Sequence, residues 1–224
     1  MNFIDIHTHN PGSDDGIISI INLLPEESLP QATPNLFYSV GLHPWLLESH
    51  VHLEDLMNRV GEISSSDRVI AIGECGLDKL AGVDFALQET VFKQHALIAE
   101  KVKKPMIIHN VKAYNELIML RIQLKASVPW IVHGFHGSPE TAGQLRNHGF
   151  MFSFGKALLN PKPKVIQSLM QIPPDLVFFE TDESDLKISE IYKIAAELRS
   201  CPIETVREQV SLNFKRLFPD VKFV

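Results

Sequence analysis

The chain has 224 residues, of which 45% are hydrophobic and 21% charged, a balance typical of a globular α/β protein with a large core. With 21 basic and 27 acidic residues its net charge is −6, which argues against a protein that coats nucleic acid through its overall positive charge. The net charge does not argue against an enzyme that binds a phosphate group locally through metal ions. The sequence has only two cysteines and no signal-peptide pattern, which predicts a cytoplasmic protein. It also lacks an apolar stretch long enough to span a membrane.

Short apolar runs predict eight strands, and most of them lack the alternation of a one-sided sheet, as is typical of parallel strands covered on both faces. In chain order the runs are 3–6, 17–21, 36–40, 69–72, 106–108, 130–132, 150–154 and 176–179. Helical patterns follow the later runs, at 84–102, 112–125, 139–148, 163–171, 187–199 and 202–217. This alternation predicts a single domain, residues 1–224, folded as a (β/α)8 TIM-type barrel.

The front of the chain departs from that pattern. Only seven residues separate His9 from Ile17, and the segment 23–35 contains Pro25, Pro30 and Pro34, so neither gap can hold a full crossover helix. We therefore expect a trimmed barrel in which the helices after the first two strands are missing or shortened. The flank opened in this way is a candidate contact for a homo-oligomer.

Metal-capable side chains stand at or just beyond the ends of five of the apolar runs. They are His7, His9, Glu74, His109, His133 and Asp182. Because the carboxyl ends of barrel strands form one mouth, we expect these side chains to converge there. Four imidazoles and two carboxylates suit divalent zinc, manganese or iron, and hold magnesium less well.

So many ligands in one set favour two divalent ions over one. Two ions can lower the pKa of a water molecule and stabilise charge on the attacking and leaving oxygens, which is hydrolysis without a protein nucleophile. Glu74, midway in the ligand order, is the natural bridging carboxylate, and Asp182 can bind one ion while accepting a proton from water. Glu74 and Asp182 are therefore the predicted catalytic residues. Cys75, whose side chain on a strand faces away from Glu74, is interpreted as a packed core thiol.

The sequence resembles the TatD family of metal-dependent hydrolases and deoxyribonucleases along nearly its whole length. The matching segments are FIDIHTH (3–9), GLHP (41–44), GECGLD (73–78), FKQ (92–94), PMIIH (105–109), HGFHG (133–137), ETD (180–182) and VSLNFKRLF (210–218). The resemblance implies cleavage of DNA, often as an exonuclease. It also implies one ion held by His7, His9, Glu74 and Asp182, and a second held by Glu74, His109 and His133.

The predicted substrate contacts depart from the family. Lys79 and Leu80 stand where the family commonly has an aromatic residue and an arginine, and Val111 stands where it often has an arginine, so fewer bidentate phosphate clamps are available. Lys156, after the seventh strand, is a candidate substrate contact, and a solvated basic loop is an equally good interpretation. The family match makes His43 a second candidate.

Aromatic and histidine side chains outside this set have less specific interpretations. Trp45 can stack a base or simply cover the mouth. The histidines at 50, 52, 95 and 148 lie on expected helices or at their edges, and we expect them at the surface.

Three hypotheses follow, and the first is favoured. It is a deoxyribonuclease that cleaves phosphodiester bonds, with DNA or another phosphodiester as partner and two divalent ions (zinc, magnesium or manganese) as cofactors. The second keeps the metals and changes the bond to an ester, lactone, amide or phosphotriester of a small molecule. The third is a non-catalytic barrel that binds metal or a partner chain. A substrate panel separates the first two, and any turnover that is lost in ligand variants dismisses the third.

Overall fold

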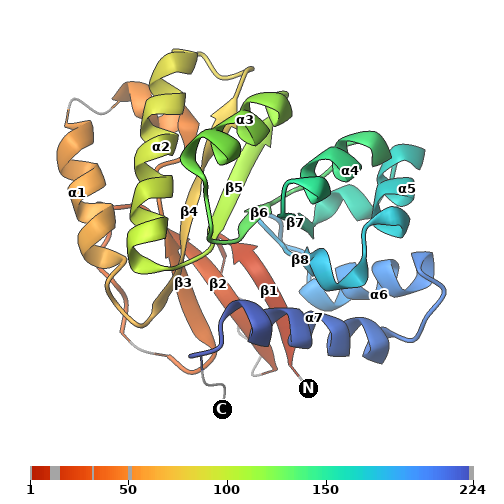
Figure 1. Cartoon of the computed structure of the whole chain (residues 1–224). Coiled ribbons are helices and arrows are strands. Elements are labelled where there is room, and N and C mark those ends of the chain that lie inside the picture. The colour runs from red at the N-terminus through yellow and green to blue at the C-terminus, as the bar shows by residue number, and fades with distance from the viewer. Residues whose placement is uncertain (1, 11–15, 32, 50–51, 222–224) are drawn as a thin grey trace. The chain divides into compact units, whose positions relative to one another are not determined.

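Eight strands lie in chain order in one sheet, β1-β2-β3-β4-β5-β6-β7-β8, in the computed structural model (Figure 1). The structure describes residues 2–10, 16–31, 33–49 and 52–221. A backbone bridge joins Thr8, at the end of the first strand, to Asp182, just after the last strand. The strand order, the helices between the strands and this bridge are those of a (β/α)8 TIM-type barrel, so the predicted fold is confirmed.

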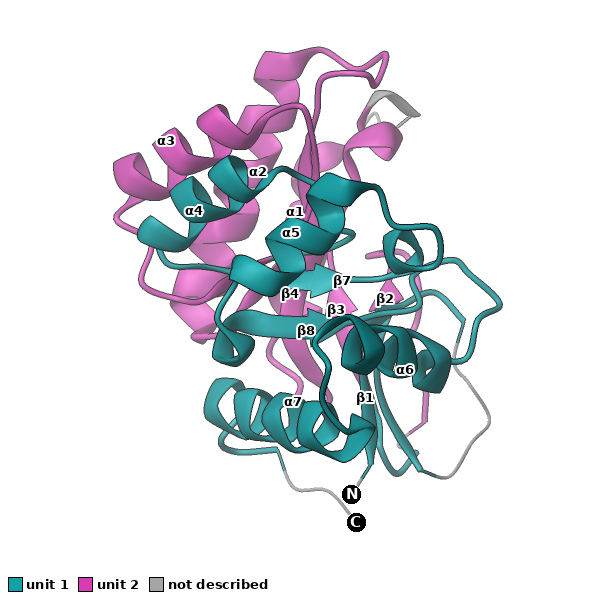
Figure 2. Cartoon of the chain, turned by 90° about the vertical axis from the view of Figure 1, so that its right-hand side faces the viewer, with its two compact units in different colours: residues 1–21, 33–36, 132–224 teal, residues 22–32, 37–131 magenta. Residues whose placement is uncertain are grey.

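The chain divides into two compact units, which Figure 2 shows in two colours. Unit 1 comprises Met1–Ile21, Thr33–Leu36 and Val132–Val224, and unit 2 comprises Asn22–Ala32 and Phe37–Ile131. Each unit therefore draws on more than one stretch of the sequence. The single domain expected from the sequence stays a prediction.

Unit 1 contains parallel strands whose ends carry several of the predicted ligands. β1 (Phe3–Thr8) pairs with β2 (Ile17–Leu23), and β7 (Phe150–Phe154) pairs with β8 (Val177–Phe179). The helices of this unit are α4 (Pro139–Asn147), η2 (Lys156–Leu158), α5 (Pro163–Gln171), η3 (Pro174–Leu176), α6 (Ile188–Leu198) and α7 (Ile203–Leu217). The ring of Phe135, fully buried, packs edge-on against Phe152 and Phe154 and forms part of the core.

Unit 2 is built around a long buried strand. β4 (Val69–Asp78) is buried at every position and pairs in parallel with β3 (Leu36–Val40) and with β5 (Met106–Val111). β6 (Trp130–Val132) begins in this unit. Its helices are η1 (Pro44–Ser49), α1 (Leu53–Ile63), α2 (Phe85–Val102) and α3 (Tyr114–Leu124). The side chain of Asp84 caps α2 by accepting a hydrogen bond from the Leu87 N–H.

The structure confirms most of the expected elements and corrects three points. α1 was not predicted, and β4 continues six residues beyond the expected end at Ile72, to Asp78. His95, expected at the surface, is fully buried in α2. His52 and His148 are exposed as expected, while His50 lies outside the described residues.

The front of the barrel is trimmed as predicted. Among the described residues between β1 and β2, and between β2 and β3, no helix occurs. The oligomer contact expected at this flank stays a prediction. No helix in the described part of the chain has the length and apolar character needed to cross a membrane.

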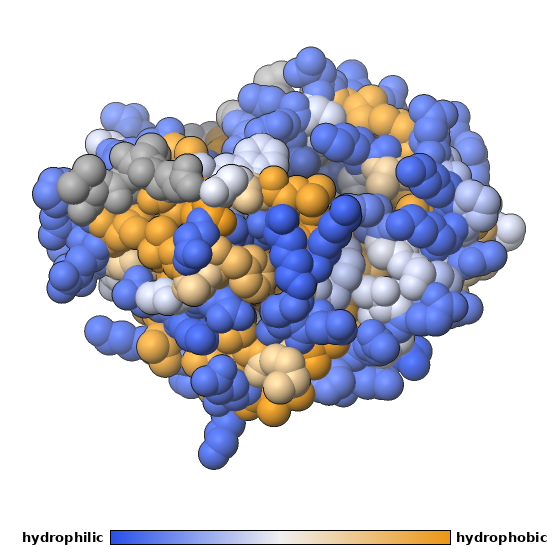
Figure 3. Space-filling model, turned by 90° about the horizontal axis from the view of Figure 1, so that it is seen from above, coloured by the Kyte–Doolittle hydropathy of each residue, from blue (hydrophilic) through white to orange (hydrophobic). Residues whose placement is uncertain are grey.

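Hydrophobic and hydrophilic side chains mix over the face seen in Figure 3, where the hydrophobic ones form several separate patches. Exposed apolar side chains are common on soluble proteins, so such a side chain does not by itself mark a functional site. The distances among the predicted metal ligands therefore locate a functional site better than exposed apolar side chains do.

Candidate metal centre

The backbone at the end of β1 brings two histidines of unit 1 to one aspartate. The Asp182 N–H donates to the carbonyl of His7, and the His9 N–H donates to the carbonyl of Asp182, both at 3.0 Å. Asp182 has a φ of 55°, in the left-handed region, where aspartate is one of the more tolerated non-glycine residues. The bridge therefore holds the Asp182 side chain beside the histidines.

The distances among these side chains fit a shared metal ion. Oδ1 of Asp182 lies 3.7 Å from Nε2 of His7 and 3.8 Å from Nε2 of His9, which is too long for hydrogen bonds. Metal–ligand bonds of about 2.1 Å at a tetrahedral angle place two ligand atoms about 3.4 Å apart. His7, His133 and Asp182 offer one ligand atom each within 4.8 Å of one another, so the predicted ligands of this unit do come together.

A buried carboxylate orients His133. Oε1 of Glu180 lies 3.2 Å from Nδ1 of His133 and accepts a hydrogen bond from the Gly134 N–H at 2.7 Å. In the neutral ring, a proton on Nδ1 faces Glu180 and leaves Nε2 as the metal-binding nitrogen. Burial raises the pKa of Glu180, but electrostatic attraction to His133 and His7, together with hydrogen bonds from His133 and Ser153, lowers it by more, so the pKa lies below its ordinary value.

A second carboxylate fixes the strand end that carries Asp182. Asp5, buried in β1, accepts hydrogen bonds from the backbone N–H of Thr181 at 3.0 Å and from its hydroxyl at 2.5 Å. Both contacts reach the residue that precedes Asp182. The position of Asp182 is therefore fixed from β1 by the backbone bridge and by this side chain.

Unit 2 holds a second group of metal-capable side chains, formed by Glu74, His109 and His43. One ligand atom from each lies within 4.8 Å of the others. Glu74 projects from β4 and is 4% exposed, and its Oε1 lies 3.2 Å from Nδ1 of His109 and 3.3 Å from Nε2 of His43. The Glu74 N–H donates to Oδ1 of Asn22 at 2.5 Å, which ties the backbone at this glutamate to β2.

Asp78, at the end of β4, orients His109 as Glu180 orients His133. Its Oδ2 lies 3.3 Å from Nε2 of His109, so a proton on Nε2 would leave Nδ1, the nitrogen beside Glu74, for a metal. Asp78 also accepts hydrogen bonds from the Trp45 indole and the Leu80 N–H. Burial would raise the pKa of Asp78, but these hydrogen bonds, with that of His109, lower it.

The ring of His43 is oriented differently from that of His109. Its Nδ1 accepts a hydrogen bond from the backbone N–H of Trp45 at 3.2 Å. In the neutral ring the proton then lies on Nε2, the nitrogen that faces Glu74. A nitrogen that carries a proton cannot bind a metal, so in this tautomer His43 donates a hydrogen bond to Glu74, and Glu74 and His109 are the members of this group left to bind a metal.

The structure places the predicted site residues as follows. His7, His9, His133 and Asp182 lie together in unit 1, and Glu74 and His109 lie together in unit 2 with His43, which was predicted as a substrate contact. Lys156 is exposed at the start of η2, as a solvated lysine would also be. The roles assigned to all of these residues stay predictions.

Sequence reasoning did not assign site roles to Asp78, Glu180 or Asn22. Glu180 follows the apolar run of β8 and Asp78 follows Gly-Leu at the end of β4, so a charged residue directly after a buried run was the available signal. Asn22 carried no comparable signal.

Comparison with known proteins points to one family. The family described as TatD related DNase matches residues 26–219. YabD of Bacillus subtilis, described as an uncharacterized metal-dependent hydrolase, is 29% identical, and the match covers 82% of this chain and 77% of YabD. YjjV of Escherichia coli, described in the same words, is 26% identical, and the match covers 82% of this chain and 76% of YjjV. A metal-dependent hydrolase of Buchnera aphidicola is 31% identical over 66% of this chain and 58% of its own length.

Solved structures share the fold. The crystal structure of YjjV, a TatD homologue from Escherichia coli, matches with a TM-score of 0.80 at 22% identity and covers 98% of both chains. A TatD family hydrolase from Entamoeba histolytica matches with a TM-score of 0.77 at 19% identity, over 96% of this chain and 97% of the other.

Proposed function

Because this chain belongs to the TatD family of metal-dependent hydrolases, we propose that it is a deoxyribonuclease that uses two divalent metal ions. The observation that carries the proposal is the pairing of histidine with carboxylate in both units. Each unit has carboxylate and imidazole ligand atoms within 4.8 Å of one another, and in each a further carboxylate orients a histidine. Zinc, manganese and magnesium are the candidate ions.

In the proposed mechanism Asp182 is the base that accepts a proton from the attacking water. When bound, two divalent ions lower the pKa of water and stabilise negative charge on a phosphoryl group. In the proposed reaction the oxygen of water attacks phosphorus, the bond to the leaving oxygen breaks, and Asp182 accepts the proton from the attacking water. The Asp182 side chain is 23% exposed, so water can reach it.

Glu74 has a positioning and charge-balancing part in the same proposal. It is nearly buried between His43 and His109, and its carboxylate can neutralise part of the charge of bound ions. The family resemblance assigns it to both ions. His43, which donates to Glu74, would keep that carboxylate in place.

The test is cleavage of end-labelled DNA with and without added metal. Glu74→Ala and Asp182→Ala should each lower kcat at least about 100-fold, because each removes a group on which the reaction depends. Glu54→Ala, on exposed α1, is the matched control and should cleave like the wild type. Circular dichroism checks that all three variants fold. Full turnover by both site variants, or by the wild type after chelation, would overturn the proposal.

A second candidate keeps the metals and changes the bond to an ester, lactone, amide or phosphotriester of a small molecule. The observation that favours it is the cleft beside Asp78, whose described lining contains no lysine or arginine. The neighbouring Lys79 ammonium lies 2.5 Å from Glu116. With equal metal loading, turnover of such a substrate together with inert DNA would favour this candidate.

A further inference from the structure

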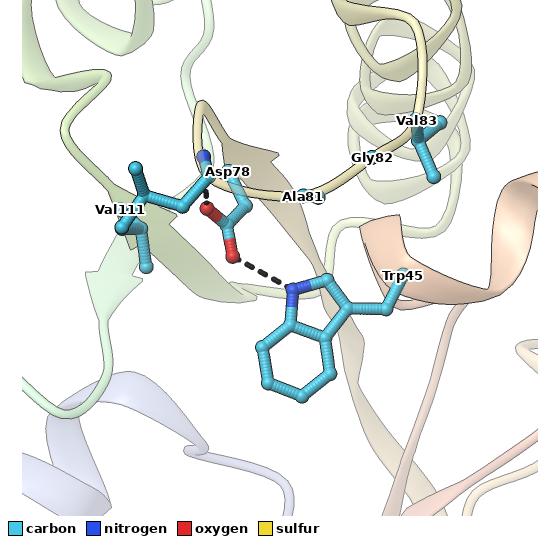
Figure 4. A pocket seen from close by; sticks show the side chains of 7 residues that line it. Trp45, Asp78, Ala81, Gly82, Val83 and Val111 are labelled. Atoms are coloured by element: carbon cyan, nitrogen blue, oxygen red, sulfur yellow. Dashed lines mark hydrogen bonds between the residues drawn. The ribbon is translucent and has the colours of Figure 1, made fainter.

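A cleft of about 430 Å³ opens in unit 2 beside Asp78, and we call it the Trp45 cleft (Figure 4). Its lining includes Trp45 from η1, Leu80 and Val83 from the loop after β4, and Val111 from the end of β5. The volume falls within the range of about 300–1,000 Å³ typical of small-molecule sites. Asp78 forms part of the lining and also contacts His109, so the cleft adjoins the metal-capable group of this unit.

Trp45 is exposed and yet fixed in orientation. The side chain of Trp45 is 61% exposed, whereas a tryptophan that only filled space would be expected to be largely buried. Its indole N–H donates to Oδ2 of Asp78 at 2.7 Å (Figure 4), and its ring packs edge-on against His43 with centroids 4.7 Å apart. The ring's one polar group is thus satisfied, and a large aromatic surface remains available without a competing hydrogen bond.

The loop that forms the opposite wall is fixed as well. Gln88, buried in α2, accepts a hydrogen bond from the Asp78 N–H at 2.7 Å and donates to the carbonyls of Asp78 and Val83 at 3.0 and 3.1 Å. One side chain therefore holds both ends of the 78–83 loop. A cleft whose walls are already in place costs little ordering when a ligand binds.

The described lining of the cleft carries no positive charge. It contains no lysine or arginine among the described residues, and its one carboxylate, Asp78, already accepts hydrogen bonds from Trp45 and Leu80 and contacts His109. The neighbouring Lys79 is directed to Glu116 and the Phe85 ring. Without a cationic side chain, and with the Asp78 carboxylate in its lining, the cleft disfavours a phosphate or carboxylate, but it suits a flat, uncharged ring beside an indole and aliphatic side chains.

We propose that the Trp45 cleft binds an uncharged flat ring of the substrate, a nucleobase or an aryl group, next to the metal-capable group of unit 2. This inference rests on the proposed hydrolase function and adds the substrate group that the site recognises. Leu80, Val83 and Val111 supply the aliphatic side chains of the lining that would face such a ring.

The experiment compares two DNA substrates of equal length and charge, a thymidine oligonucleotide and its abasic tetrahydrofuran counterpart, with the metal-loaded protein. In Trp45→Ala, the ratio of kcat/KM for the thymidine substrate to that for the abasic one should fall by about 5-fold to 100-fold, the range for loss of base stacking. Trp45→Phe keeps a ring and should retain most of the ratio. Leu97→Ala, an equally exposed side chain on α2, is the control and should leave the ratio unchanged. An unchanged ratio in Trp45→Ala would overturn the inference.

Binding of uncharged probes tests the cleft without turnover. Thymidine should bind the metal-loaded wild type saturably, deoxyribose should not, and Trp45→Ala should weaken thymidine binding at least about 5-fold. Benzyl alcohol binding at the same site would indicate an aryl group as well as a nucleobase. If DNA is not cleaved but thymidine binding depends on Trp45, the nuclease proposal fails and the ring site stands. Absence of saturable binding by thymidine and benzyl alcohol would overturn the ring site.

Discussion

The nitrogen that a histidine offers to a metal is set by the hydrogen bond of its other nitrogen. His109 faces Asp78 through Nε2, and His133 faces Glu180 through Nδ1. The two rings would therefore bind metal through different atoms, Nδ1 in His109 and Nε2 in His133. His43 differs from both, because its Nδ1 accepts a hydrogen bond from the backbone N–H of Trp45 and its proton therefore lies on Nε2.

Removing the carboxylate behind His109 should weaken metal binding. Asp78→Ala leaves the His109 ring free to turn, and we expect the affinity of the unit 2 group for zinc to fall about 10-fold to 100-fold. Competition with a chromogenic chelator measures the change. Asp55→Ala, on the exposed face of α1, removes a carboxylate of the same unit and should bind zinc like the wild type. Equal affinity in Asp78→Ala and wild type would refute the role given to Asp78.

β4 and β5 approach each other closely where they carry the ligands of unit 2. Gly76 pairs with His109 in the sheet register, and a Cβ atom on Gly76 would lie only 1.9 Å from the His109 carbonyl oxygen. Only glycine fits at this point without moving one strand. The register that places His109 opposite Gly76 also places Asp78 opposite Val111.

A methyl group at this position should therefore cost stability. Gly76→Ala is expected to lower the free energy of unfolding by about 3 kcal/mol or more, because backbone rather than a mobile side chain must shift. Gly61→Ala, within α1 and with nothing within 4 Å of the added atom, should instead raise it by up to about 1 kcal/mol. Urea denaturation measures both. Equal stability of Gly76→Ala and wild type would show that the strands can separate there freely.

The buried His95 joins α2 to the end of β3. Its Nε2 accepts a hydrogen bond from the Leu42 N–H at 3.0 Å, and its Nδ1 donates to the Val91 carbonyl at 2.9 Å. Burial lowers the pKa of His95 to about 4. As pH falls below about 6.5, the unfolded chain binds the proton before the folded chain does, so stability is full above that pH and is lost toward pH 4.

This loss can be measured by substitution. Between pH 6.5 and pH 4, His95 should account for a fall of about 3 kcal/mol in the free energy of unfolding. His95→Gln should be less stable than wild type at pH 7 and should show a correspondingly smaller fall across this interval in urea titrations. His52→Gln, on an exposed histidine of the same unit, should follow the wild-type curve. Parallel curves for wild type and His95→Gln would contradict the assignment.

Regular elements were predictable from pattern, and their exact pairing was not. Apolar runs located the strands because parallel strands buried on both faces need apolar residues throughout. α1 also had a usable signal, since Leu53, Leu56, Met57, Val60 and Ile63 follow helical spacing. The contacts of Asp78 with His109 depend on the β4–β5 register, which shifts between Ile72 and Cys75, and residue patterns do not encode such a shift.

At the scale of the molecule, each of the two units contains a metal-capable group among its described residues, built on the ends of parallel strands. Such sites couple metal binding to folding, because ions that bind only the folded protein stabilise it in proportion to the logarithm of their concentration. Family membership supports metal-dependent hydrolysis, and the geometry indicates which residues of each unit would supply the ligands. The binding of two ions by these side chains is therefore the central claim.

Elemental analysis of the purified protein after metal loading tests this claim most directly. We predict two ions per chain in the wild type and one in each of two variants, His7→Ala, which removes a ligand of the unit 1 group, and His109→Ala, which removes a ligand of the unit 2 group. A chain that binds no ion, or that keeps two ions in both variants, would contradict the account.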